Sequence, residues 1–315
     1  DDGKGGKIKK DVSDVGVQNL KDAGVDVLVV LGGDGTLTSA RDFSRKGVQV
    51  IGVPKTMDND LSSTDLTYGF ISAMSVGTDF IDRLQTTAKS HHRVICCELM
   101  GRDAGWLAGS TVVTGRVDLI VLPEVDFDKE KLLAQVKKCM DEKGKCYIVT
   151  SEGAHYAYIA AGEAVNDGFG HAVLGGAGEN LKNMILEAGI APRAKVQDLS
   201  TAARSSNFAQ SLVDVTEAFE LGMSAHSRSA DGKFTGHVVA VQREYVDGRY
   251  NAKFISGPAE NFANHVKHVP VEWILPDYQG LTQEFYDYIT PLIQGEPTLI
   301  MENGIPKTIV PFNKR

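Results

Sequence analysis

The sequence predicts an α/β fold in which a parallel sheet carries helices on both faces. Short apolar runs alternate with segments of helical length along the chain. The first two runs, at residues 27–31 and 48–53, are rich in valine and end abruptly in glycine-rich or polar turns. Continuous apolar runs of this length are typical of strands buried on both faces. The helical segments between them fit the crossover connections that parallel strands need.

The elements are assigned in chain order from the spacing of apolar residues. Residues 68–89 place apolar side chains along a helical stripe, whereas residues 94–100 form a continuous run that suits a strand. The expected helices cover residues 11–23, 37–46, 68–89, 106–114, 129–143, 179–188, 214–225 and 281–294, and the expected strands cover residues 27–31, 48–53, 94–100, 118–122, 145–150, 193–199 and 234–242.

Composition limits the classes of partner. The 315 residues have ordinary apolar and charged fractions, 42% and 23%, which suit one large or two medium globular domains. A formal net charge of -8 argues against a nucleic-acid or anionic-membrane partner. The sequence has no apolar segment of membrane-spanning length. Four cysteines, at positions 96, 97, 139 and 146, lack metal-ligand spacing, so we expect reduced thiols and a cytoplasmic location.

The first loop, GGDGT at residues 32–36, suits a bound phosphate. Its three glycines let the backbone approach an anion, and the following helix presents its positive end to the same place. Asp34 fits beside a phosphate only with a cation between them, which implies Mg²⁺. Thr36 is expected as the helix N-cap. The alternative is an ordinary glycine-rich turn with Asp34 solvated, because short glycine motifs recur by chance.

The second loop, PKTMDND at residues 54–60, concentrates polar groups after the second strand. Asp58 and Asp60 lie close together in sequence, with Lys55 and Thr56 just upstream. Neighbouring carboxylates can raise the pKa of one of them, as a general base requires. The alternative is an Asx-type turn that ends a strand.

These loops belong to a longer pattern, with SHHR at residues 90–93, ELMGR at residues 98–102 and SEG at residues 151–153. In order and spacing the pattern resembles the 6-phosphofructokinases, from about Lys7 to near the end of the chain. The first loop alone also occurs in NAD kinases and diacylglycerol-type lipid kinases. The resemblance implies two Rossmann-like parallel-sheet domains with helices on both faces. It also implies phosphoryl transfer from ATP–Mg to the 1-hydroxyl of fructose 6-phosphate, by a homo-oligomer with shared sugar-phosphate sites.

The resemblance also implies a division of the chain. Residues 1–115 would bind ATP and Mg²⁺, residues 116–280 would bind the sugar phosphate, and residues 281–315 would form a helix and arm that pack back on the donor domain. The sequence opens without methionine, and the family's first glycine-rich strand and turn is absent. We therefore expect the donor domain to be incomplete at its N-terminus.

The resemblance assigns the transfer chemistry to the two loops and to Arg102. Asp58 aligns with the family's base, Asp60 with its supporting carboxylate, and Thr56 with a residue that orients the phosphoryl group. Arg102 would stabilise transition-state charge, and Asp34 would hold Mg²⁺. The donor-binding residues would be Gly33, Asp34, Gly35, Thr36 and Lys55.

On the sugar side, Met100, Gly101 and Glu152 match family contacts, together with Thr56, Asp58 and Arg102. Arg93 and Arg204 match phosphate-binding arginines, and the family's equivalent of Arg93 reaches into a neighbouring subunit's site. A lone arginine is otherwise explained by a surface ion pair. The match around Arg204 is the weakest, because Thr201 stands where the family often has histidine.

The phosphoryl donor depends on two residues that disagree. Gly35 resembles the ATP-using members, in which no side chain obstructs the α-phosphate. Lys55 resembles the pyrophosphate users, although some ATP users combine this glycine with this lysine. Steric exclusion is harder to evade than one added charge, so ATP is the expected donor and pyrophosphate the main alternative. An inactive regulatory paralogue that binds sugar phosphates is the non-enzyme alternative.

Overall fold

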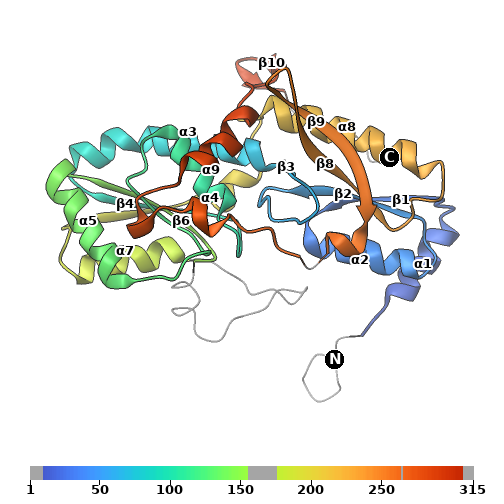
Figure 1. Ribbon diagram of the computed structural model, residues 1–315, viewed down its shortest axis with the longest axis horizontal. Coiled ribbons are helices and arrows are strands. Elements are labelled where there is room, and N and C mark those ends of the chain that lie inside the picture. Colours follow the sequence, from blue (N-terminus) through green and yellow to red (C-terminus); the bar gives the residue numbers. More distant parts are fainter. Residues whose placement is uncertain (1–9, 155–175, 264, 308–315) are drawn as a thin grey trace.

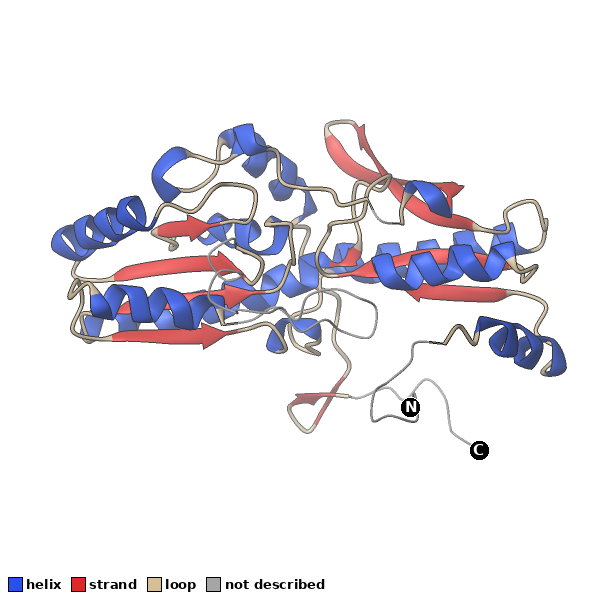
Figure 2. Cartoon of the chain, turned by 90° about the horizontal axis from the view of Figure 1, so that it is seen from below, coloured by secondary structure: helices blue, strands red, loops and turns tan. Residues whose placement is uncertain are grey.

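The computed structural model describes residues 10–154, 176–263 and 265–307. Two sheets lie side by side along the long axis of the molecule, and helices cover both faces of each (Figure 1). Figure 2 shows the same two helix-covered sheets from below. A third, two-stranded sheet near the C-terminus pairs β10 (Met301–Glu302) with β11 (Ile305–Pro306).

One sheet is entirely parallel among the described residues, with strand order β5-β6-β4-β7. Its strands are β4 (Val94–Leu99), β5 (Leu119–Val121), β6 (Cys146–Ser151) and β7 (Ala194–Asp198). Helices α3 (Phe70–Ser90) and α4 (Trp106–Ser110) cover one face, and α5 (Lys129–Lys143) and α7 (Ala177–Glu187) cover the other. Every residue of β4, β5 and β6 is buried, as a strand covered on both faces requires.

The other sheet is mixed, with order β1-β2-β8-β9. Strands β1 (Leu28–Gly32), β2 (Val50–Thr56) and β8 (His237–Val246) are parallel, and the short β3 (Tyr68–Gly69) pairs in parallel with the end of β2. Strand β9 (Arg249–Pro258) runs antiparallel to β8. Helices α1 (Ser13–Asp22) and α2 (Asp34–Arg45) pack on one face, and α8 (Leu212–Ser229) packs on the other.

Strand β9 was not expected from the sequence, although its signal is present. Asp247 and Gly248 join the two strands with φ values of 51° and 75°. An Asp-Gly pair with both φ angles positive is the preferred connection of a two-residue hairpin. The parallel sheet expected from the sequence therefore carries an additional antiparallel strand at this edge.

The sheets do not follow the expected division at residues 115 and 280. Strand β4 precedes residue 115 but pairs with β6 and β7, whereas β8 and β9 pair with β2 and complete the first sheet. Strands that pair across long sequence separations carry no local signal of their partner. A division of the chain into consecutive segments therefore could not predict which strands share a sheet.

The C-terminal helix is shorter than expected and lies between the two sheets. Helix α9 (Gln283–Ile289) gives way to a 3₁₀ turn, Thr290–Leu292, because Pro291 disfavours a continuing α-helix. Phe285 and Tyr288 pack on Trp106 of α4, with ring centroids 6.1 and 4.8 Å away. Residues 308–315 of the expected arm lie outside the described part of the chain.

Helix α8 buries an acidic side chain. Glu217 is 4% exposed, and its carboxylate accepts a hydrogen bond from the Tyr250 hydroxyl of β9. Burial raises the pKa of Glu217 from 4.5 to about 7. Because the pKa of Glu217 is higher in the folded than in the unfolded protein, protonated Glu217 stabilises the fold. This stabilisation is complete below pH 4.5 and is lost as the pH rises through 7.

We therefore expect Glu217→Gln to flatten the fall in unfolding free energy between pH 4.5 and 7. At pH 8 the variant should be the more stable protein, by on the order of 3 kcal/mol at most. Urea unfolding at a series of pH values measures both effects. Exposed Glu220→Gln is the matched control, and equal pH slopes for wild type and Glu217→Gln would contradict the expectation.

Among the described residues, no helix has the length and apolar character needed to span a lipid bilayer.

Candidate active site

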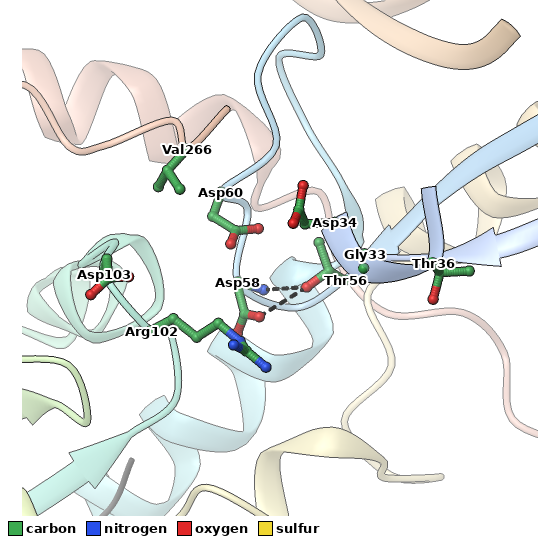
Figure 3. Close-up of a pocket in the computed structure, with 10 residues that line it drawn as sticks. Gly33, Asp34, Thr36, Thr56, Asp58, Asp60, Arg102, Asp103 and Val266 are labelled. Atoms are coloured by element: carbon green, nitrogen blue, oxygen red, sulfur yellow. Dashed lines mark hydrogen bonds between the residues drawn. The ribbon is translucent and has the colours of Figure 1, made fainter. Parts of the chain in front are cut away.

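A cavity of about 250 Å³ opens where the carboxyl ends of strands from the two sheets approach each other (Figure 3). The glycine-rich turn after β1 and the polar turn after β2 line it from one side, and the turn after β4 lines it from the other. Ligand sites of open α/β sheets lie at this edge. The lining residues are Gly33, Asp34, Gly35, Thr36, Thr56, Asp58, Asp60, Arg102, Asp103 and Val266.

The turn after β2 holds Asp58 in a defined position. The Thr56 hydroxyl donates to Asp58 Oδ2 at 3.1 Å and accepts from the Asp58 backbone N–H at 3.2 Å. The other carboxylate oxygen, Oδ1, is buried and has no hydrogen-bond partner among the described residues. One oxygen of Asp58 is therefore fixed by Thr56, and the other is left for a group that enters the site.

Asn59 gives this turn its shape. Its φ is 54°, a left-handed conformation that asparagine tolerates better than most residues. Its buried amide donates to the Tyr288 hydroxyl at 2.9 Å and accepts from the Thr67 backbone N–H at 3.2 Å. These bonds fix the peptide between Asp58 and Asp60.

The carboxylates of this turn are held in a poorly solvated environment. Burial raises the pKa of Asp58, although the hydrogen bond from Thr56 and then the charge of Arg102 counteract part of the effect. Burial and then the neighbouring charge of Asp58 raise the pKa of Asp60 to about 7. A raised pKa makes each of these buried carboxylates a better proton acceptor than a solvated one.

The turn after β4 brings a fixed positive charge to the cavity. In Figure 3 the Arg102 side chain points toward Asp58. Gly101 has a φ of 145°, and a Cβ there would lie 2.4 Å from the Ala104 carbonyl oxygen, so only glycine fits. The Arg102 backbone N–H donates to Glu152 Oε1 at 3.3 Å, which ties this turn to the end of β6. Burial and then the charge of Asp58 raise the pKa of Glu152 to about 7.

The glycine-rich turn differs in detail from the expectation. Helix α2 begins at Asp34, so Asp34, Gly35 and Thr36 form its first turn and Gly33 is the N-cap. The expectation that Thr36 caps the helix is therefore wrong. The helix N-terminus itself borders the cavity, and backbone N–H groups at a helix N-terminus favour an anion.

Five predicted donor and sugar contacts lie beside the cavity without lining it, namely Lys55, Met100, Gly101, Glu152 and Arg204. Lys55 is exposed on β2, next to buried Thr56, because successive strand residues point to opposite faces. Its charge still lowers the pKa of Asp58, as do the charges of Arg102 and Arg204. Arg204 donates from Nε to the Met100 sulfur at 3.4 Å, which places Arg204 next to the turn after β4.

Arg93 is the predicted site residue that lies apart from the cavity. It immediately precedes β4, whereas Met100, Gly101 and Arg102 follow this six-residue strand. At roughly 3.3 Å per residue, the strand separates Arg93 from Arg102 by about 20 Å. Within one chain, Arg93 therefore does not join the other predicted site residues.

One charged neighbour of the site was not expected from the sequence. Lys267 donates from Nζ to Asn59 Oδ1 at 3.2 Å, and its backbone N–H donates to the Asp60 carbonyl at 2.6 Å. Burial lowers the pKa of Lys267 to about 7. Nothing in the neighbouring sequence marks this lysine, because its place depends on contacts across more than 200 residues.

The match to known proteins decides the family. Residues 4–228 match the family described as phosphofructokinase. The chain belongs to the phosphofructokinase family. One relative, named ATP-dependent 6-phosphofructokinase 2, from Clostridium perfringens (strain 13 / Type A), is 58% identical over 156 residues. That alignment spans 49% of this chain and 42% of the relative.

Other phosphofructokinases align over more of the chain. The pyrophosphate–fructose 6-phosphate 1-phosphotransferase of Amycolatopsis mediterranei (strain S699) is 38% identical over 260 residues, which are 81% of this chain and 72% of that protein. The crystal structure of the pyrophosphate-dependent phosphofructokinase from Nitrosospira multiformis has a TM-score of 0.79 at 26% identity. It covers 93% of this chain and 74% of that one. The phosphofructokinase fold predicted from the sequence is confirmed, and the relatives' names include both phosphoryl donors.

Proposed function

We propose that the protein transfers a phosphoryl group from ATP–Mg to the 1-hydroxyl of fructose 6-phosphate and so produces fructose 1,6-bisphosphate. The observation that carries this proposal is the convergence of three groups on one cavity. A helix N-terminus that favours phosphate, a buried carboxylate with a raised pKa and a fixed guanidinium lie around the same space. Phosphoryl transfer needs a positioned nucleophile and neutralised phosphate charge more than it needs covalent chemistry.

Asp58 is proposed as the base. Its free Oδ1 accepts the hydroxyl proton of the sugar, while the hydrogen bond between Thr56 and Oδ2 keeps the carboxylate oriented. Asp60 is proposed as the supporting carboxylate, a buried neighbour whose own pKa the charge of Asp58 helps to raise to about 7. Arg102 stabilises the charge that develops on the transferring phosphoryl group.

The residues around the cavity fit a magnesium ion. Asp34, Asp58 and Asp60 line the same space and supply hard oxygen donors, which Mg²⁺ prefers. Without a cation, their charges repel each other and an incoming phosphate, as the raised pKa of Asp60 indicates. When bound, the ion neutralises the phosphates of the donor and orients them. Asp34, in the first turn of α2, is the proposed ligand.

Glu152, Met100, Gly101 and Arg204 are proposed to hold the sugar phosphate at the ends of β4 and β6. Glu152 is 6% exposed, and it borders Arg102 through the hydrogen bond from the Arg102 backbone N–H. A carboxylate at this place accepts sugar hydroxyls, and a guanidinium binds the distal phosphate.

Arg93 is proposed to act on a neighbouring subunit's site in a homo-oligomer, since its own cavity is out of reach. We expect that a mixture of Arg93→Ala and Asp58→Ser proteins, after subunit exchange, regains activity that neither has alone. A statistical mixture of dimers should recover about one quarter of the wild-type rate, because half of the dimers carry one intact site of two. Absence of recovery despite exchange, demonstrated by mass spectrometry of labelled subunits, would show that each subunit completes its own site.

An acceptor panel tests the proposed reaction class. With ATP–Mg in excess, fructose 6-phosphate should be phosphorylated, whereas NAD and diacylglycerol should not. Those two acceptors belong to the kinases that share only the glycine-rich turn. Phosphorylation of NAD or diacylglycerol at the higher rate would contradict the proposal, and sugar-phosphate binding without turnover would favour a regulatory paralogue.

A further inference from the structure

A group of reactive side chains lies away from the cavity, at the opposite end of β6. Cys146 begins this strand, Cys139 lies in the last turns of α5, and Asp118 immediately precedes β5. One sulfur or carboxylate oxygen of each lies within 4.8 Å of those of the other two. Glu152 follows the other end of the strand, about 20 Å away at roughly 3.3 Å per residue. Chemistry at these cysteines is therefore independent of the proposed function.

The chain reversal between α5 and β6 brings the two cysteines together. Helix α5 ends at Lys143, and Gly144 reverses the chain in a left-handed conformation with φ 67°. Cys139 then lies beside Cys146, only seven positions further along the chain, and the two sulfur atoms are within 4.8 Å of each other. When protonated, Cys139 Sγ also donates to the Lys145 carbonyl at 3.2 Å.

Two ammonium groups lie next to this pair. Lys143 Nζ lies 2.7 Å from Asp118 Oδ1, and Lys145 Nζ lies 3.3 Å from Oδ2 of the same carboxylate. The hydrogen bond from Cys146 lowers the pKa of Cys139, and its reciprocal effect raises the pKa of Cys146. Two adjacent sulfur atoms close to two ammonium groups match the surroundings of a redox-active dithiol.

We propose that Cys139 and Cys146 form a peroxide-sensitive dithiol that closes reversibly to a disulfide. The Cys139 thiolate attacks one oxygen of a peroxide and breaks the O–O bond, which gives a sulfenic acid and, from hydrogen peroxide, hydroxide. Cys146 then loses its proton and attacks the Cys139 sulfur, and the sulfenic hydroxyl leaves as water with that proton. Two thiols are oxidised by two electrons, one peroxide is reduced, and two waters form after proton transfer.

The other two cysteines do not form a pair of this kind, although Cys139 and Cys146 are buried as well, with 6% and 0% of their surface exposed. Cys96 and Cys97 are neighbours in the middle of β4, so their side chains enter the cores on opposite faces of the sheet. Burial raises the pKa of Cys96 to about 12 and raises that of Cys97 as well. They therefore stay protonated and separated, and they serve as internal references.

A thiolate-bound divalent metal ion is the other ligand chemistry that two cysteines and an aspartate suggest. The surroundings disfavour it. Lys143 and Lys145 occupy both oxygens of Asp118, and Oδ2 also accepts the Tyr147 backbone N–H at 2.8 Å. A cation would have to displace two ammonium groups from the carboxylate that would bind it.

Treatment of the folded, reduced protein with a small excess of hydrogen peroxide tests the proposal. Free thiols are then alkylated after denaturation, and peptides are mapped by mass spectrometry. We expect a Cys139–Cys146 cross-linked peptide that dithiothreitol reverses, with loss of these two thiols roughly tenfold faster than loss of Cys96 and Cys97. In Cys146→Ser, dimedone should trap a sulfenic acid on Cys139, and in Cys139→Ser no bridge should form.

Three results would overturn the proposal. One is that the wild-type protein forms no such bridge while circular dichroism shows that it is folded. Another is that all four cysteines react at equal rates. The third is that zinc added alone is retained after dialysis at one ion per chain and lost in Cys139→Ser, which would identify a metal site instead. The wild-type measurement needs no variant to fold.

Discussion

Replacing Asp58 by serine is expected to lower kcat for fructose 6-phosphate phosphorylation by at least about two decades, the size typical of losing a general base. The fold should persist, because burial raises the pKa of Asp58 and its removal relieves an unfavourable buried charge. Sugar-phosphate binding should also persist, because Glu152, Arg102 and Arg204 remain. Steady-state kinetics with saturating ATP–Mg, together with calorimetric titration of fructose 6-phosphate, separates the two effects.

Asp58→Asn is the matched variant for this experiment. Its amide oxygen keeps an acceptor for the Thr56 hydroxyl, which lies 3.1 Å from Oδ2, but it cannot take a proton from the sugar. Both variants should therefore lose turnover to a similar degree. Near-normal kcat in either folded variant would mean that Asp58 is not the base.

Changing Gly35 to aspartate is expected to reduce ATP use far more than pyrophosphate use. Gly35 lies in the first turn of α2 and lines the cavity, where a carboxylate would meet the additional phosphate of a nucleotide. Steric and like-charge penalties of on the order of 1 to 3 kcal/mol each correspond to a combined loss between about 30-fold and 25,000-fold in kcat/KM for ATP. Parallel assays with ATP and pyrophosphate measure the ratio.

Two further variants, Gly35→Ala and Lys55→Gly, separate the effects of side-chain volume and of charge on donor preference. The alanine adds volume without charge, so it should affect ATP less than aspartate does. Lys55 is exposed on the other face of β2, and its loss should weaken transfer from ATP only modestly and leave the donor preference unchanged. Native protein that turns over pyrophosphate faster than ATP would mean that Lys55, and not Gly35, determines the donor.

The local parts of the fold could be predicted from the sequence. Valine-rich runs identified β1 and β2, and the turns after them identified two sides of the cavity, because these signals depend on neighbouring residues. Sheet membership could not be predicted, because β8 pairs with β2 from about 185 residues away. The β8–β9 hairpin, in contrast, has a local signal in Asp247-Gly248.

At the site, too, residues with a local sequence signal could be predicted, whereas residues placed by long-range contacts could not. Thr56, Asp58 and Asp60 stand together in sequence, and the structure places them around one cavity with Gly33–Thr36 and Arg102. Lys267 carries no local signal. Cys139 and Cys146 have no metal-ligand spacing, and only the reversal after α5 and the position of Asp118 reveal them as a group.

Phosphorus NMR of the reaction mixture tests most directly whether this cavity transfers a phosphoryl group from ATP–Mg to the 1-hydroxyl of fructose 6-phosphate. It identifies the donor consumed and the product formed in one measurement. We expect ATP–Mg and fructose 6-phosphate to give ADP and fructose 1,6-bisphosphate, faster than pyrophosphate does and not at all after magnesium is chelated. Fructose 1,6-bisphosphate formed from pyrophosphate alone, or no bisphosphate from either donor, would contradict the proposed function.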